Sequence, residues 1–152
     1  MKDKTQLISG GVVYRPGKKG DYWFIVRQNS SSDWIIPKAS VRKGESSVRT
    51  SIRIMADLGG MRAKVLEEVG RANGTITINT KAVAQKHIYY LMVQKSAGEP
   101  VGFSETQWLD YAKAVKKLSL IRDKKMLKLA REVLKKWKID QKLRKIQPDE
   151  FE

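Results

Sequence analysis

The chain has 152 residues, of which 41% are hydrophobic and none is cysteine. This length and hydrophobic content predict one domain with a real core rather than a disordered tail. The lack of cysteine excludes disulfides, thiolate chemistry and cysteine-ligated metals. Thirty-one lysines and arginines against sixteen acidic residues give a formal net charge of +15, which is typical of proteins that bind nucleic acid or another polyanion.

The first part of the chain alternates apolar segments with turn residues. Residues 7–15 and 22–28 are predicted strands, the second central in its sheet because it is apolar almost throughout. Residues 16–20 predict a turn between them, and residues 34–36 a short third strand. No apolar run approaches the ~20 residues of a membrane span, and the polar start MKDKTQ lacks the pattern of a signal peptide. We therefore expect a cytoplasmic protein with no membrane partner.

Residues 36–61, IPKASVRKGESSVRTSIRIMADLGGM, predict a strand end, a tight loop and one helix. Gly59 and Gly60 give a strong signal for the end of the helix. Apolar residues recur in it at helical spacing, and we expect their stripe to face a sheet. The stripe comprises Val48, Ile52, Met55 and either Ile54 or Leu58.

This stretch resembles the Nudix box, whose pattern is G-x5-E-x7-R-E-U-x-E-E-x-G-U, where U is an aliphatic residue. The matching positions are Glu45, Arg53, Met55, Gly60 and Met61. The opening glycine is replaced by Ala39, and the three metal-binding glutamates of the family are replaced by Ile54, Asp57 and Leu58. The segment QKHIYYLM resembles a later strand of Nudix domains related to diadenosine polyphosphate hydrolases. The resemblance implies an α/β Nudix fold, with a mixed β-sheet sandwiched between helices.

In the Nudix family the three glutamates bind magnesium or manganese, which activates water against a diphosphate linkage. These cations require oxygen ligands, and two of the three positions here are apolar. We therefore predict a retained fold with no catalytic residue, no metal and no cofactor, in which Glu45, Arg53 and Asp57 are vestigial. Glu45 and Arg53 are expected to pair and to brace the loop against the helix. Glutamates that could complete a metal site from elsewhere are Glu67, Glu68 and Glu105.

After the box, residues 63–71 and 75–78 predict strands around a hairpin turn at Asn73-Gly74, and residues 83–93 predict another strand. His87, the only histidine, is expected to be a packed strand residue.

A short helix is predicted at 111–118 and a long one from Asp123, its expected N-cap, to about residue 143. The apolar face of the long helix comprises Leu127, Ala130, Val133 or Leu134, and Trp137. Apolar residues thin out beyond Trp137, so the helix is expected to outrun the domain. We divide the chain into a Nudix-like domain, residues 1–134, and an extended basic C-terminal helix with an acidic tail, residues 135–152.

Residues 111–146 carry fourteen lysines and arginines against three acidic residues, a net charge of +11. Like charges one turn apart destabilise a helix, so an excess of this size indicates a binding role rather than a solvated surface. The residues predicted to contact nucleic acid are Lys124, Lys125, Lys128, Arg131, Lys135, Lys136, Lys138, Lys142, Arg144 and Lys145.

Three functions fit these features. The first is a non-catalytic Nudix-fold protein that binds structured RNA, such as ribosomal RNA, as a ribosomal or ribosome-associated component with ribosomal proteins as further partners. The second is a divergent Nudix hydrolase that uses Mg²⁺ or Mn²⁺ to cleave a nucleoside polyphosphate or capped RNA. The third is a protein–protein scaffold, for which the residues give no positive sign. We predict the first, because the second leaves its metal without ligands.

Overall fold

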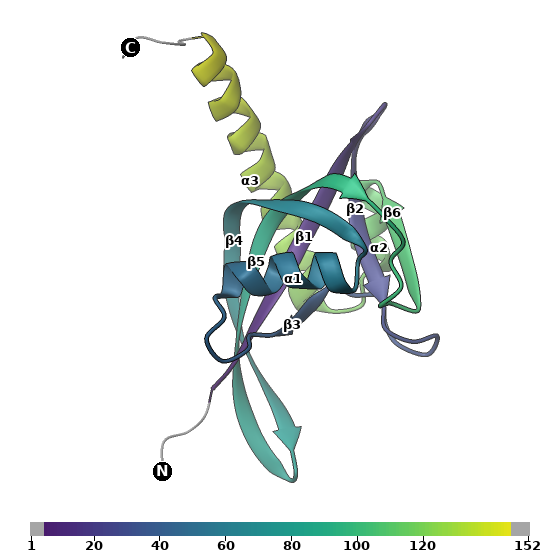
Figure 1. Ribbon diagram of the computed structural model, residues 1–152, viewed down its shortest axis with the longest axis vertical. Coiled ribbons are helices and arrows are strands. Elements are labelled where there is room, and N and C mark those ends of the chain that lie inside the picture. Colours follow the sequence, from purple (N-terminus) through teal and green to yellow (C-terminus); the bar gives the residue numbers. More distant parts are fainter. Residues whose placement is uncertain (1–4, 147–152) are drawn as a thin grey trace.

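One mixed β-sheet organises the molecule, with its strands in the order β4-β5-β1-β2-β6 and with β3 paired to the start of β1 (Figure 1). The computed structural model describes residues 5–146. β1 and β5 run parallel, and the other neighbouring strands are antiparallel. The strands are β1 (Gln6–Gly17), β2 (Gly20–Arg27), β3 (Lys38–Ser40), β4 (Met61–Ile78), β5 (Lys81–Ala97) and β6 (Glu105–Leu109).

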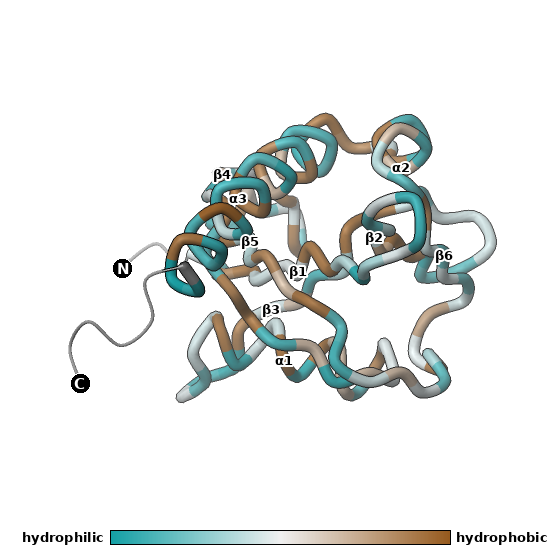
Figure 2. Tube along the Cα trace, turned by 90° about the horizontal axis from the view of Figure 1, so that it is seen from above, coloured by the Kyte–Doolittle hydropathy of each residue, from teal (hydrophilic) through white to brown (hydrophobic). Residues whose placement is uncertain are grey.

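Helices cover both faces of the sheet, as expected. α1 (Ser47–Asp57) lies on one face, and α2 (Tyr111–Lys117) and α3 (Ile121–Ile146) lie on the other (Figure 2). Because successive side chains of a strand point to opposite faces, the core divides into two apolar clusters. Val13 and Met92 belong to the cluster under α1, whereas Val12 and Leu91 belong to the cluster under α2 and α3.

The box helix buries a different face from the one predicted. Val48 and Ile52 are 37% and 39% exposed, and α1 instead buries Thr50, Ser51, Ile54 and Met55. The small residues on this face let the helix lie close to the sheet. The buried Ser51 hydroxyl donates a hydrogen bond within the helix, to the Val48 carbonyl 2.7 Å away. The prediction was right for Ile54 and Met55 and wrong for the first two turns, where hydroxyl side chains take the inward positions.

The hairpin prediction was also wrong in position. β4 runs unbroken through Asn73 and Gly74, and the chain turns at Asn79 and Thr80, whose φ angles are +50° and +66°. Gly74 instead leaves room for the Arg122 side chain, because a Cβ at this position would lie 3.2 Å from the Arg122 guanidinium.

One further strand prediction was wrong. Residues 34–36 contribute only a single bridge, between Ile35 and Val26, and the short strand is β3 instead. β2 lies inside the sheet between β1 and β6, as its apolar sequence predicts.

α3 begins at Ile121, two residues before the predicted N-cap, so Asp123 lies inside its first turn. The predicted apolar face is confirmed: Leu127, Ala130 and Leu134 are buried, and Trp137 packs partly buried against the same cluster. The C-terminal part of α3 extends past the body of the sheet (Figure 1). Within residues 5–146, no helix combines the length and apolar character that crossing a membrane would require.

Candidate functional site

The loop and helix of the box are joined by the predicted ion pair. Arg53 donates from Nε to Glu45 Oε2 at 2.8 Å and from a terminal nitrogen to Oε1 at 3.0 Å. The Thr50 hydroxyl also donates to this carboxylate, at 2.6 Å. Hydrogen bonds from Arg53 and then Thr50 lower the pKa of Glu45 to about 2. The pair therefore stays charged at neutral pH and braces the loop against α1.

The metal-binding positions of the box do not fit a metal. Ile54 is fully buried in the apolar cluster that includes Met55 and Phe103. Leu58 packs against the same cluster and fills the space where a Cβ on Gly102 would stand. Asp57 is exposed, and neither of the other two metal-binding positions of the box carries a carboxylate. A divalent cation held by one exposed carboxylate would lack the oxygen ligands it requires.

Carboxylates from elsewhere do not complete the site. Glu105 pairs with Arg27 at 3.2 Å on the far side of β2, and Glu68 pairs with Arg71 at 2.9 Å. Across residues 5–146, no three acidic, histidine or cysteine side chains come together as a metal would require. The alternative set of ligands is therefore absent from the part of the chain that the structure describes.

A buried ion pair joins β3 to the start of α3. Lys38 Nζ lies 2.9 Å from both carboxylate oxygens of the fully buried Asp123. The same carboxylate accepts from the Tyr89 hydroxyl at 2.8 Å and from the backbone N–H of Ile36 at 3.0 Å. Burial lowers the pKa of Lys38 and raises the pKa of Tyr89, with the Asp123 charge opposing the first shift and adding to the second. Protein donors thus saturate this carboxylate.

Sequence reasoning places Asp123 as an N-cap and misses this network, because the ion pair joins positions 85 residues apart. The available signal is a lysine directly after Pro37, ahead of the box, together with an acidic residue near the start of an otherwise basic helix. Neither feature indicates which residue is its partner, so the ion pair can be recognised only in the folded structure.

Helical geometry divides the ten predicted nucleic-acid contacts of α3. At 3.6 residues per turn, seven of them share one side of the helix, at alternating spacings of four and three. We call these residues the basic stripe: Lys124, Lys128, Arg131, Lys135, Lys138, Lys142 and Lys145. No acid occupies a stripe position, because Asp123 is buried and Asp140 lies on another side, while Glu132 borders the stripe and lies 3.6 Å from Lys135. The predicted contacts outside the stripe are Lys125, Lys136 and Arg144.

The basic stripe faces α2 and the β1–β2 turn. Lys138 Nζ lies 2.7 Å from Asp21 Oδ2, and the Arg131 guanidinium lies 4.2 Å from the ring centroid of Tyr111. A pocket of about 390 Å³ lies between the three elements, and Lys19 also lines it. Lys19 of the turn therefore extends the stripe, and Lys18 precedes it in the same turn.

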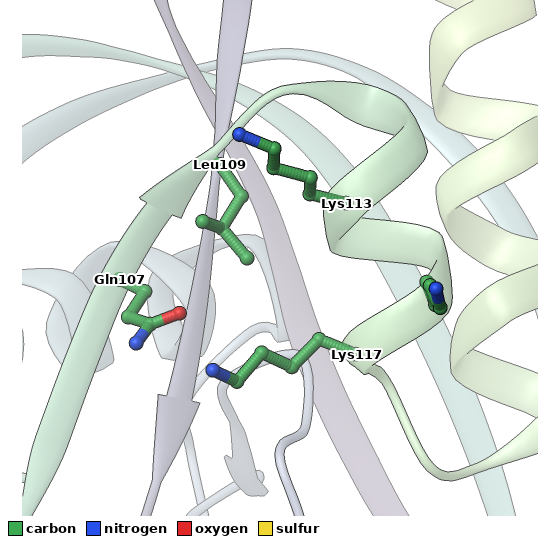
Figure 3. Close-up of a pocket in the computed structure, with 5 residues that line it drawn as sticks. Gln107, Leu109, Lys113 and Lys117 are labelled. Atoms are coloured by element: carbon green, nitrogen blue, oxygen red, sulfur yellow. The ribbon is translucent and has the colours of Figure 1, made fainter.

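α2 adds lysines that the sequence prediction did not assign to binding. Lys113 and Lys117 reach from α2 over Leu109 of β6, and Gln107 lies on the other side of the same pocket, which has a volume of about 320 Å³ (Figure 3). Lys116 also lines it. The lysines of α2, the two lysines of the β1–β2 turn and the basic stripe are together called the basic surface below.

Comparison with known proteins places this arrangement among Nudix structures. An Ap4A hydrolase of C. elegans, solved as a binary complex, superposes with a TM-score of 0.67 at 15% identity, covering 86% of this chain and 98% of that chain. The NUDIX domain of Shewanella oneidensis NrtR, complexed with ADP ribose, superposes with a TM-score of 0.68 at 14% identity, covering 88% of this chain and 90% of that one.

In sequence, the chain is 24% identical over 110 residues to the putative mutator protein MutT4 of Mycobacterium tuberculosis. The match covers 70% of this chain and 44% of that protein, so the chain spans less than half of the relative's length. No protein-family model matches the chain.

The fold is therefore an α/β sandwich of the Nudix class, built on one mixed sheet with helices on both faces. The chain has a Nudix hydrolase-like domain with a degenerate Nudix box, in which the Glu45–Arg53 brace is present and two of the three metal positions are apolar.

Proposed function

We propose that the protein is a non-catalytic Nudix-fold protein that binds structured RNA through its basic surface, as a ribosomal or ribosome-associated component. The observation that carries the proposal is the segregation of charge on α3, where seven cations line one side and, within residues 5–146, only two of them, Lys135 and Lys138, pair with an acid. The apolar filling of the box supports the absence of catalysis, because Ile54 is fully buried where a hydrolase would need a carboxylate.

The basic stripe suits a phosphate backbone. It runs from residue 124 to residue 145, a length of about 30 Å at 1.5 Å per residue. Its exposed lysines neutralise phosphates and release counterions, which supplies affinity without reading sequence. The aromatic and apolar residues near it, Tyr111 and Leu134, are packed in the pocket beside Arg131 and anchor the helix. Recognition is therefore expected to follow RNA shape more than base identity.

The test is the salt dependence of binding to a labelled RNA hairpin, measured by fluorescence anisotropy. Five or six phosphate contacts give a slope of roughly −4 to −5 in log K against log salt. The triple variant Lys128→Gln, Lys135→Gln, Lys142→Gln is expected to flatten this slope by about 2.7, or about 0.9 for each lost contact.

A charge-matched control keeps the stripe intact. The variant Lys43→Gln, Arg49→Gln, Lys81→Gln removes the same charge from exposed sites outside α2 and α3. It is expected to keep most of the slope. Equal losses from both triple variants would mean that only net charge matters, and an affinity indifferent to salt and to both variants would overturn RNA binding.

The ribosomal assignment has its own test. The native protein is sedimented from a cell lysate with and without ribonuclease. Co-migration with ribosomes that is lost at high salt supports the assignment. If the protein instead sediments with a particle other than the ribosome, and ribonuclease removes it from that particle, its partner is another RNA.

A divergent Nudix hydrolase is the second candidate. The observations in its favour are the intact Glu45–Arg53 brace and the hydrolase activity named for the C. elegans structure of the same fold. Nucleoside triphosphates, dinucleoside polyphosphates, nucleotide sugars and capped RNA are assayed with Mg²⁺ and Mn²⁺. Turnover of about 1 s⁻¹ or faster that is abolished by Asp57→Asn would replace the non-catalytic proposal with this one. No turnover above the uncatalysed rate is the expected result.

A further inference from the structure

A second pattern lies beside the basic stripe, roughly 100° further around α3. Among the residues of α3 whose exposure is described, the exposed large apolar residues lie there: Ile121, Leu129, Ile139 and Leu143. Both exposed acids of the helix lie there too: Asp140, and Glu132, which is also 3.6 Å from Lys135 of the stripe. We call the central line of this side the seam, which runs at alternating spacings of four and three through Lys125, Leu129, Glu132, Lys136, Ile139 and Leu143. Three of these six residues are apolar and the other three carry both signs of charge, a composition that suits packing against a second helix.

The two halves of the seam differ in their surroundings. Ile139 and Leu143, in the C-terminal part of α3, are 58% and 55% exposed. At the other end, Leu129 lines a groove of about 440 Å³ between α3 and residues 70–73 of β4. One half of the seam thus presents exposed apolar side chains, and the other half borders a groove with an apolar floor, which includes Met126, and a cationic rim.

We propose that α3 pairs antiparallel with α3 of a second copy along the seam. Centred near Leu134, this pairing sets Leu129 against Ile139 of the second copy and Glu132 against its Lys136. Two-fold symmetry makes each contact twice, so the surface is complementary to itself. The projecting Ile139 and Leu143 of each copy then cover the groove of the other.

Charge favours this occupant and this direction. Antiparallel pairing brings Asp140 of the second copy to a groove lined by Arg122 and Lys125, and by Arg71, which also pairs with Glu68. A parallel pairing would instead oppose Lys136 to Lys136 and Glu132 to Glu132. The seam lies roughly 100° around α3 from the basic stripe and touches it only through the Glu132–Lys135 pair, so the dimer leaves most of each stripe free. The inference stands independently of RNA binding.

The mass of the ribonuclease-treated protein in high salt, measured by light scattering after gel filtration, tests the dimer. The expected mass is twice that of the 17.3 kDa chain. The variant Ile139→Gln, Leu143→Gln is expected to be monomeric and still folded, because both side chains lie beyond the core. The control Lys135→Gln, Lys142→Gln, on the basic stripe, is expected to remain dimeric. A chain that stays monomeric up to about 1 mM overturns the proposal.

Engineered cysteines test the direction, since the chain has none of its own. Positions 129 and 139 are about 15 Å apart along one helix, too far for a disulfide within a chain. The variant Leu129→Cys, Ile139→Cys is therefore expected to form a covalent dimer on mild oxidation, whereas each single variant is not. Efficient cross-linking of both single variants would indicate a parallel dimer and overturn the proposed pairing.

A charge exchange gives an independent check. Lys136→Glu opposes two carboxylates at each contact and is expected to weaken the dimer several-fold. Adding Glu132→Lys restores opposite charges and is expected to restore the dimer. Failure of the second change to rescue the first would overturn the Glu132–Lys136 contact and with it the proposed register.

Discussion

Ile54 is the residue at which this chain departs most clearly from the metal-binding pattern of the Nudix box. It occupies a position where the Nudix box has a metal-binding glutamate, and it is fully buried among Met55, Phe103 and other apolar side chains. Leu58, one turn later, closes the same region against Gly102. The loss of carboxylates was readable in the sequence. That the apolar replacements join the core, rather than line an open cleft, could be known only from the packing.

Replacing Ile54 with glutamate is therefore expected to destabilise the fold. Ile54→Glu buries a charge without a partner and is expected to lower the free energy of unfolding by about 4 kcal/mol or more. Ile54→Val, which only removes a methyl group, is expected to cost about 0.5–1.5 kcal/mol. Thermal unfolding followed by circular dichroism measures both. A wild-type melting temperature for Ile54→Glu without metal would show that this position is not closed.

Thermal unfolding also tests whether a metal site can be rebuilt in the box. If Ile54→Glu with Leu58→Glu rebuilds a metal site around Asp57, Mg²⁺ should recover part of the lost stability, because a ligand that binds only the folded state stabilises it. No recovery at millimolar Mg²⁺ would mean that more than these two side chains separates the box from function.

His87 gives a prediction about pH. Burial first, and then the charges of Arg122 and Lys38, lower its pKa from an ordinary 6.5 to about 4, while Asp123 opposes the shift. Between these pH values the unfolded chain binds a proton that the folded chain does not. The free energy of unfolding is therefore expected to fall as the pH decreases from 6.5 to 4 and to gain no further slope from His87 below that.

Melting temperatures across this range test the assignment. His87→Gln should flatten the slope between pH 6.5 and 4, and it should leave the loss below about pH 4.5 that comes from Glu45, whose folded pKa is about 2. Parallel curves for the variant and the wild type would assign the slope to another group.

At the scale of elements, local sequence signals predicted several boundaries and faces correctly. The Gly59-Gly60 stop, the short helix α2 and the apolar face of α3 were all predicted. The hairpin was wrong because Asn73-Gly74 carries the stronger turn signal, whereas in the sheet both residues pair with β5. The turn instead falls on Asn79-Thr80, where a β-branched residue adopts a positive φ.

Thr80 is thus expected to be a strained turn residue. The left-handed region costs a β-branched side chain of order 1–3 kcal/mol, and Asn-Gly is the preferred pair for such a turn. Thr80→Gly is therefore expected to raise the free energy of unfolding by about 1 kcal/mol, and the melting temperature by about 2–4 °C. The control Thr77→Gly, inside β4, is expected to destabilise. A lower melting temperature for Thr80→Gly would place the turn elsewhere.

At the scale of the whole molecule, the charge excess was predicted but its layout was not. Composition and position placed net positive charge after residue 110, and helical spacing divides the cations of α3 between two sides. What the sequence could not supply is which side faces other elements. Contacts of Lys138 with Asp21 and of Arg131 with Tyr111 join the stripe to the β1–β2 turn and α2. The cationic surface is therefore larger than the C-terminal helix alone.

A larger surface predicts that RNA affinity depends on α2 as well as on α3. The variant Lys113→Gln, Lys116→Gln, Lys117→Gln leaves α3 untouched and removes three cations from the pocket beside Leu109. If each meets a phosphate, the slope of log K against log salt is expected to flatten by about 2.7, as for the stripe variant. Combining the two triple variants is expected to flatten the slope more than either variant alone, because contacts from separate elements add. The variant Lys43→Gln, Arg49→Gln, Lys81→Gln controls for net charge, and an α2 variant that behaves like this control would confine RNA to α3.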